Sequence, residues 1–84
     1  MEKKDYQFIK AEIAGRINPE LTNVEVYCDT DGIEEGVDVY GKPSDGGTIH
    51  DVEAVVQVCA YYGLNVYIHN ERHNGYLLPT MHVF

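Results

Sequence analysis

The sequence has few basic residues. Lysine and arginine together number 6, aspartate and glutamate number 14, and the formal net charge is -8 at pH 7 with histidine neutral. Proteins that bind nucleic acid use lysine and arginine to neutralise phosphates, and a surface this acidic repels phosphate. We therefore expect no direct binding to nucleic acid.

Long hydrophobic runs and cysteines are also scarce. The longest nearly apolar run, residues 58–64, is far shorter than the roughly 20 residues of a membrane-spanning helix, and the polar N-terminal residues do not resemble a secretory signal. Two cysteines, Cys28 and Cys59, are fewer than a small disulfide-stabilised secreted protein usually has. We expect a cytoplasmic protein without membrane contact and with reduced thiols. A Cys28–Cys59 bridge is the alternative.

Apolar residues are frequent enough for one core. They make up 44% of the 84 residues, which argues against disorder, and a chain of this length has room for one domain. The pattern predicts a single α+β domain, residues 1–84, built from two halves of about residues 1–42 and 43–84. Each half has the order helix, strand, strand.

The first half begins with an amphipathic helix. Over residues 5–17 the apolar positions are three and four apart, which forms one buried stripe of Tyr6, Ile9, Ile13 and Ile17. Residues 22–29 and 33–40 then alternate apolar and polar side chains, as half-buried strands do. Asp31-Gly32 predicts a tight turn that sets Val26 opposite Val37. The glutamates at 34 and 35 leave a longer loop as the alternative.

The second half repeats this order after a loop over residues 41–47. Thr48 followed by Asp51 predicts a helix from 48 to about 62 with Thr48 as its N-cap and Gly63 beyond its end. Its predicted buried stripe is Val52, Val55, Val56 and Cys59. Two strands follow, at residues 66–70 and about 76–84, and Asn74-Gly75 predicts the turn between them. This register pairs Val66 with Val83 and Tyr67 with His82, and Pro79 marks the start of the regular part of the last strand.

Two amphipathic helices and two half-buried hairpins predict a two-layer sandwich. The four-stranded antiparallel sheet then has both helices on one face. The order αββαββ fits a ferredoxin-like topology whose first strand has moved to the C-terminus, and this places the second and fourth strands in the middle of the sheet. Alternatively, the two αββ units are joined differently or are completed by a second chain.

The other face of this sheet is the candidate interaction surface. The side chains assigned to it are aromatic, acidic or histidine, with one leucine: Glu25, Tyr27, Asp38, Tyr40, Tyr67, His69, Leu78, His82 and Phe84. Aromatic residues of this kind are enriched in the centres of protein interfaces. Tyrosine is also simply a good strand former, which is the alternative explanation. A platform for a small molecule or for single-stranded nucleic acid is a weaker option, because Glu25 and Asp38 oppose phosphate.

Motifs for chemistry are sparse. His69 and His82, with His73 and Glu71 nearby, could hold zinc or iron, although no ligand pair has a fixed helical spacing. Asp29-Thr30-Asp31-Gly32 departs from a calcium loop in its glycine position and in its flanking strands. Cys28 and Cys59 are both predicted to point inward, and Ser44 lacks a nucleophile elbow. We therefore expect neither a catalytic residue nor a cofactor.

The sequence thus favours a small acidic protein-interaction module without enzymatic activity, acting as an inhibitor or as a nucleic-acid mimic on another protein. A homodimer through the open sheet face is one alternative. A metal-binding enzyme or sensor using His69, His82 and nearby carboxylates is the other.

Overall fold

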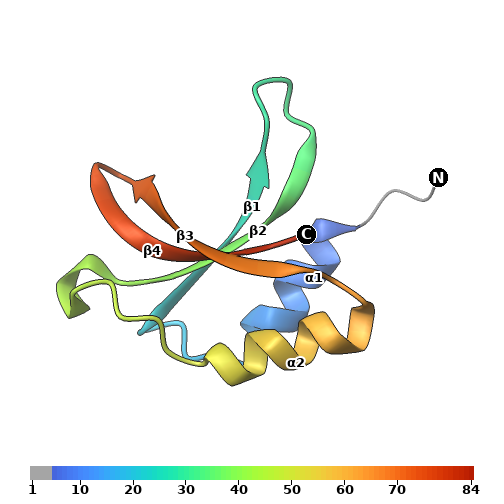
Figure 1. The fold of residues 1–84 in the computed structure, drawn as a ribbon, viewed down its shortest axis with the longest axis horizontal. Coiled ribbons are helices and arrows are strands. Elements are labelled where there is room, and N and C mark those ends of the chain that lie inside the picture. Colours follow the sequence, from blue (N-terminus) through green and yellow to red (C-terminus); the bar gives the residue numbers. More distant parts are fainter. Residues whose placement is uncertain (1–4) are drawn as a thin grey trace.

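Two helices cover one face of a four-stranded antiparallel sheet in the computed structural model, which describes residues 5–84 (Figure 1). Residues 1–4, part of the predicted domain, lie outside this range. The elements in chain order are α1 (Tyr6–Ala14), β1 (Thr22–Cys28), β2 (Glu34–Gly41), a short 3-10 helix η1 (Pro43–Asp45), α2 (Val52–Tyr62), β3 (Val66–His73) and β4 (Tyr76–Val83). The predicted two-layer α+β fold of order αββαββ is confirmed.

The strand order is β1-β2-β4-β3, so β2 and β4 lie in the middle of the sheet as predicted. It is the order of a ferredoxin-like sheet whose first strand has moved to the C-terminus. The pairings between β1 and β2 and between β3 and β4 have the predicted registers: Val24 with Val39, Val26 with Val37, Val66 with Val83 and Tyr67 with His82. Asn74 and Gly75 both have positive φ, at 52° and 87°, as a two-residue type I′ turn requires.

The loop between β1 and β2 is longer than the predicted two-residue turn. The register shifts after Tyr27, so that Cys28 pairs with Glu34, and Asp29 closes the loop. Its Oδ1 accepts hydrogen bonds from the backbone N–H groups of Asp31 and Ile33, at 2.9 and 2.8 Å. Because of this irregularity Cys28 is exposed, and its predicted inward orientation is wrong. Both cysteines are free thiols.

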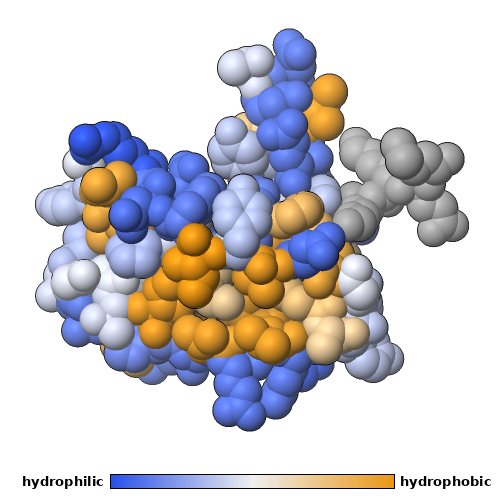
Figure 2. Space-filling model, in the orientation of Figure 1, coloured by the Kyte–Doolittle hydropathy of each residue, from blue (hydrophilic) through white to orange (hydrophobic). Residues whose placement is uncertain are grey.

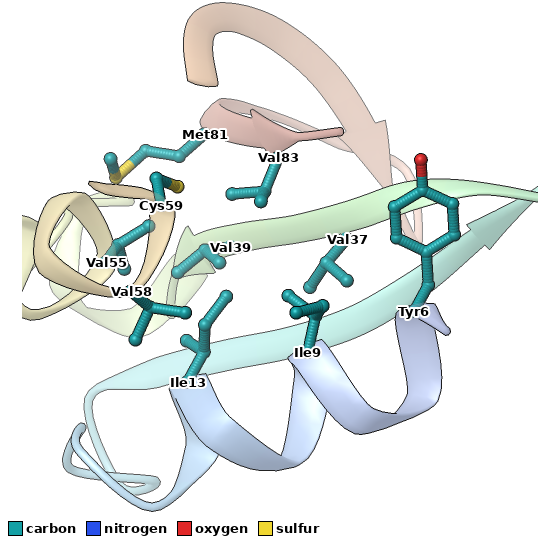
Figure 3. Close-up of a cluster of buried hydrophobic side chains, with 10 residues drawn as sticks. All are labelled: Tyr6, Ile9, Ile13, Val37, Val39, Val55, Val58, Cys59, Met81 and Val83. Carbon is teal, nitrogen blue, oxygen red and sulfur yellow. The ribbon is translucent and has the colours of Figure 1, made fainter. Parts of the chain in front are cut away.

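The core lies between the helices and the two central strands (Figure 3). The predicted stripe of α1 is confirmed, since Tyr6, Ile9 and Ile13 are buried and Ile17 packs against the same cluster. The sheet contributes Val37 and Val39 from β2 and Met81 and Val83 from β4, and α2 contributes Val55, Val58 and Cys59. Alternate residues of the central strands therefore point away from the helices.

Both helices are shorter than predicted. The first ends at Ala14, and Gly15 caps it with a backbone N–H that donates to the Ala11 carbonyl at 3.0 Å. The second begins at Val52, because Asp51 has a positive φ of 60°, which a continuous α-helix excludes. Thr48 is therefore not the N-cap. Its hydroxyl donates to the Asp45 carbonyl instead.

The buried stripe of α2 is also rotated relative to the prediction. Val55 and Cys59 are buried as expected, but Val58 replaces Val56, and both Val52 and Val56 are exposed. On the neighbouring edge strand, Ile68 faces the helix side of the sheet and is still 60% exposed. Figure 2 shows apolar side chains gathered over α2 and β3. Within residues 5–84, neither helix combines the length and apolar character needed to cross a membrane.

Because Ile13 is fully buried between both layers, shortening it leaves a small cavity. We expect Ile13→Val to lower the free energy of unfolding by about 0.5–1.5 kcal/mol, measured by chemical denaturation. The matched control is Ile33→Val in the loop between β1 and β2, where the side chain is exposed and the change should lie within about 0.5 kcal/mol of zero. Equal effects at the two positions would contradict this packing.

Candidate functional site: an acidic aromatic cavity on the open sheet face

A cavity of about 260 Å³ opens on the face of the sheet that the helices leave free. All four strands line it, with the side chains of Tyr27, Glu35, Asp38, Tyr67, His69, Glu71 and His82. The hairpins β1–β2 and β3–β4 extend away from the helix layer on this side of the sheet (Figure 1). The predicted open face therefore exists, and it is concave rather than flat.

A hydrogen-bonded pair, Asp38 and His82, lies in this cavity. Asp38 on β2 is directly opposite His82 on β4, and their Oδ1 and Nδ1 atoms are 2.7 Å apart. Their side chains are only 7% and 13% exposed. An ionised carboxylate can only accept, so Nδ1 of His82 donates the hydrogen bond. Such a charge-assisted bond, shielded from water, fixes the orientation of the imidazole ring.

Gly36 makes room for this ring. A Cβ atom at position 36 would lie 2.7 Å from Cε1 of His82 and 2.6 Å from the Val83 carbonyl oxygen, both closer than atoms can approach without a shift. The missing side chain on β2 thus allows the imidazole to lie close to the neighbouring backbone.

Aromatic rings surround His82. The ring centroids of Tyr27 and Tyr67 are 5.8 and 5.3 Å from that of His82, and Phe84 stacks on it at 5.5 Å. Tyr27 and Tyr67 come from the two outer strands and are 43% and 47% exposed. They stand on either side of the cavity, where a bound group could contact both rings.

Part of the open face outside the cavity is closed to solvent. Tyr40 is 4% exposed and stacks on His73 with ring centroids 3.5 Å apart. Burial, a hydrogen bond to Glu25 and the nearby negative charges raise the pKa of Tyr40 far above its ordinary value. Leu78 is buried too, and a Cβ at Gly47 would overlap its side chain, which shows how closely the loop covers it.

The predicted interaction residues therefore separate into groups. Four line the cavity with their side chains, namely Tyr27, Tyr67, His69 and His82, and Asp38 joins them as a buried partner. Phe84 supports the rings of Tyr67 and His82. Tyr40 is buried and so does not lie on the exposed surface as predicted, and Glu25, which helps to raise the pKa of Tyr40, is not among the residues that line the cavity.

Glu35 was missed from the predicted surface. The register shift after Tyr27 leaves it without a partner on β1, between Gly36 opposite Tyr27 and Glu34 opposite Cys28. Strict alternation along β2 cannot place such a bulged residue. The sequence feature that indicates such an irregularity is the pair Glu34-Glu35 next to Gly36.

Of the four metal candidates, His69, His82 and Glu71 line the cavity, and His73 lies apart from them. His73 lies in the closed part of the face, with Nε2 2.8 Å from the Thr80 hydroxyl. The ring centroids of His69 and His82 are 6.0 Å apart. Nε2 of His69 is buried 3.5 Å from Oε1 of Glu71 and has no hydrogen-bond partner among the described residues. Within residues 5–84, no group of three or more histidine, cysteine or acidic side chains has the geometry of a metal site.

The charge in the cavity is of one sign. Its lining holds three carboxylates, from Glu35, Asp38 and Glu71, and among the described side chains that line it there is no lysine or arginine.

No protein-family model matches the chain, and neither a curated protein nor a solved structure was found to be similar to it. The chemistry of the cavity is therefore the basis for assigning a function.

The fit of His82 over Gly36 can be tested by adding a methyl group. We expect Gly36→Ala to lower the free energy of unfolding by roughly 1–3 kcal/mol, because the new Cβ overlaps the ring and the Val83 carbonyl. Gly15→Ala is the matched control, since its Cβ meets nothing closer than 3.5 Å and its φ of -71° suits alanine. It should leave stability unchanged or raise it by up to about 1 kcal/mol. Equal losses in both variants would refute this fit.

The buried phenol of Tyr40 predicts an alkaline loss of stability. Because its pKa is raised on folding, its contribution is present below the ordinary pKa of 10.0 and is lost as the pH rises above it. One such group changes the unfolding free energy by up to about 1.4 kcal/mol per pH unit. Tyr40→Phe should therefore flatten the dependence of unfolding free energy on pH above 10. The exposed Tyr76→Phe is the control, and identical slopes for both variants would contradict the burial of Tyr40.

Proposed function

We propose that this chain is a protein-interaction module that binds a basic segment of another protein on the open face of its sheet. The supporting observation is the cavity itself, which combines three carboxylates and two half-exposed tyrosine rings with no basic side chain among its described lining residues. Tyrosine supplies contact area at low entropic cost, and carboxylates attract lysine and arginine.

The overall charge acts in the same direction. A net charge of -8 on 84 residues attracts a basic partner over a distance and speeds its association, and salt weakens this attraction. A basic groove that normally holds nucleic acid is one surface of this kind. In that form the module is an inhibitor that competes with DNA or RNA, and phosphates themselves are repelled.

A basic partner fits this face better than a second copy of the chain does. In a dimer through the open face, the acidic surface that holds Glu35 and Glu71 would face the same surface of the second copy. Like charges brought together in this way oppose association. We also place the protein in the cytoplasm, which the two free cysteines support.

Binding can be mapped by nuclear magnetic resonance with a decapeptide that alternates glycine with lysine or arginine. We expect amide shifts at Tyr27, Tyr67 and His82, and an affinity that falls as salt rises from about 0.05 to 0.5 M. A decapeptide with glutamate in place of the basic residues is the control for charge. Shifts confined to α2 and Ile68, or an affinity that salt leaves unchanged, would refute the proposal.

Two tyrosine variants test whether peptide binding depends on the rings in the cavity or on any exposed tyrosine. We expect Tyr67→Ala to weaken binding of the basic decapeptide about tenfold, which corresponds to about 1.4 kcal/mol. Tyr76→Ala is the matched control, because Tyr76 is also exposed on a strand but lies outside the cavity. Equal losses in both variants would contradict the assignment of the cavity as the binding site.

A further inference from the structure

We infer that the cavity is a subsite for a guanidinium group, so that the basic segment places an arginine side chain between Tyr27 and Tyr67. This inference rests on the proposed function and adds the chemical class of the group that is bound. It is carried by the size of the cavity, the arrangement of its rings and the kind of polar atoms that line it.

The size suits one side chain. Sites for drug-sized molecules usually enclose about 300–1,000 Å³, and this cavity of about 260 Å³ lies just below that range. The cavity also opens to solvent between the two hairpins, where the main chain of a bound segment could remain outside. A single long side chain that enters from a peptide matches both features.

The rings favour a planar cation. Tyr27 meets the His82 ring edge-on, with an angle of 85° between the planes, and Tyr67 is tilted against it by 54°. The planes of the Tyr27 and Tyr67 rings are therefore inclined differently to the His82 ring that lies beside both in the cavity. A guanidinium group is flat and weakly hydrated and stacks on aromatic faces, whereas the ammonium of lysine is a strongly hydrated point charge.

The polar atoms are complementary to a group that only donates. Guanidinium has five N–H donors and no acceptor. Glu35 and Glu71 present carboxylate oxygens, which only accept when ionised. Because Asp38 is already paired with His82, a bound cation leaves that buried hydrogen bond intact.

Short peptides that differ in one central residue test the class of the bound group. The probes are acetylated and amidated pentapeptides of glycine with arginine, lysine or citrulline in the middle, titrated against the whole protein by nuclear magnetic resonance. Citrulline has nearly the shape of arginine without its charge. We expect arginine to bind at least about tenfold more tightly than citrulline and several-fold more tightly than lysine, with shifts at Tyr27, Tyr67 and His82.

The outcomes separate this inference from the proposed function. If lysine binds as tightly as arginine at the same residues, the guanidinium subsite is refuted and the basic-partner proposal stands. If citrulline equals arginine, charge is not recognised and the inference fails. If neither these peptides nor the basic decapeptide shifts the cavity residues, both proposals fail together.

Removing charge inside and outside the cavity gives a second test. Glu35→Gln removes a carboxylate from the cavity, and Glu20→Gln removes an exposed one elsewhere, so the net charge changes equally. We expect Glu35→Gln to weaken the arginine pentapeptide several-fold more than Glu20→Gln does. Equal effects would show that only overall charge matters and would overturn the subsite. Glu35 is exposed, so the variant should remain folded, and thermal unfolding checks this.

Discussion

The pairing of β2 with β4 is the contact on which both faces of the sheet depend. It sets Val37 against Val83 and Val39 against Met81 on the helix side, and it sets Asp38 against His82 on the other. Because strand side chains alternate, a single register builds the apolar core and the polar pair at once. A shift by one residue would bury the carboxylate among valines and expose the valines to water.

Most of the sheet could be predicted from the sequence because its signals are local. Alternating valines and the Asn74-Gly75 turn fix which residues of a hairpin face each other, and the structure has these registers. The start of α2 could not be predicted in this way. Thr48 is of a residue type that often caps helices, but the positive φ of Asp51 interrupts the helix predicted from residue 48. A Cβ at Gly41 would overlap the Thr48 carbonyl, so this segment is held against the end of β2.

The candidate site was predicted in part for the same reason. Alternation placed Tyr27, Tyr67 and His82 on one face, which is where the structure has them. The Asp38–His82 bond depends on two strands from different hairpins, and a hairpin pattern alone does not give their mutual register. The burial of Tyr40 depends on the stacking of His73 and on the cover over that half of the face, both of which are tertiary features.

The central claim is that Asp38 holds the His82 ring in one orientation and so shapes the cavity. Nitrogen-15 chemical shifts of the imidazole report directly which ring nitrogen carries a proton. The account predicts a proton on Nδ1 of His82, hydrogen-bonded to Asp38 and slow to exchange with water, whether or not the ring is charged. A neutral ring with its proton on Nε2 alone would contradict it.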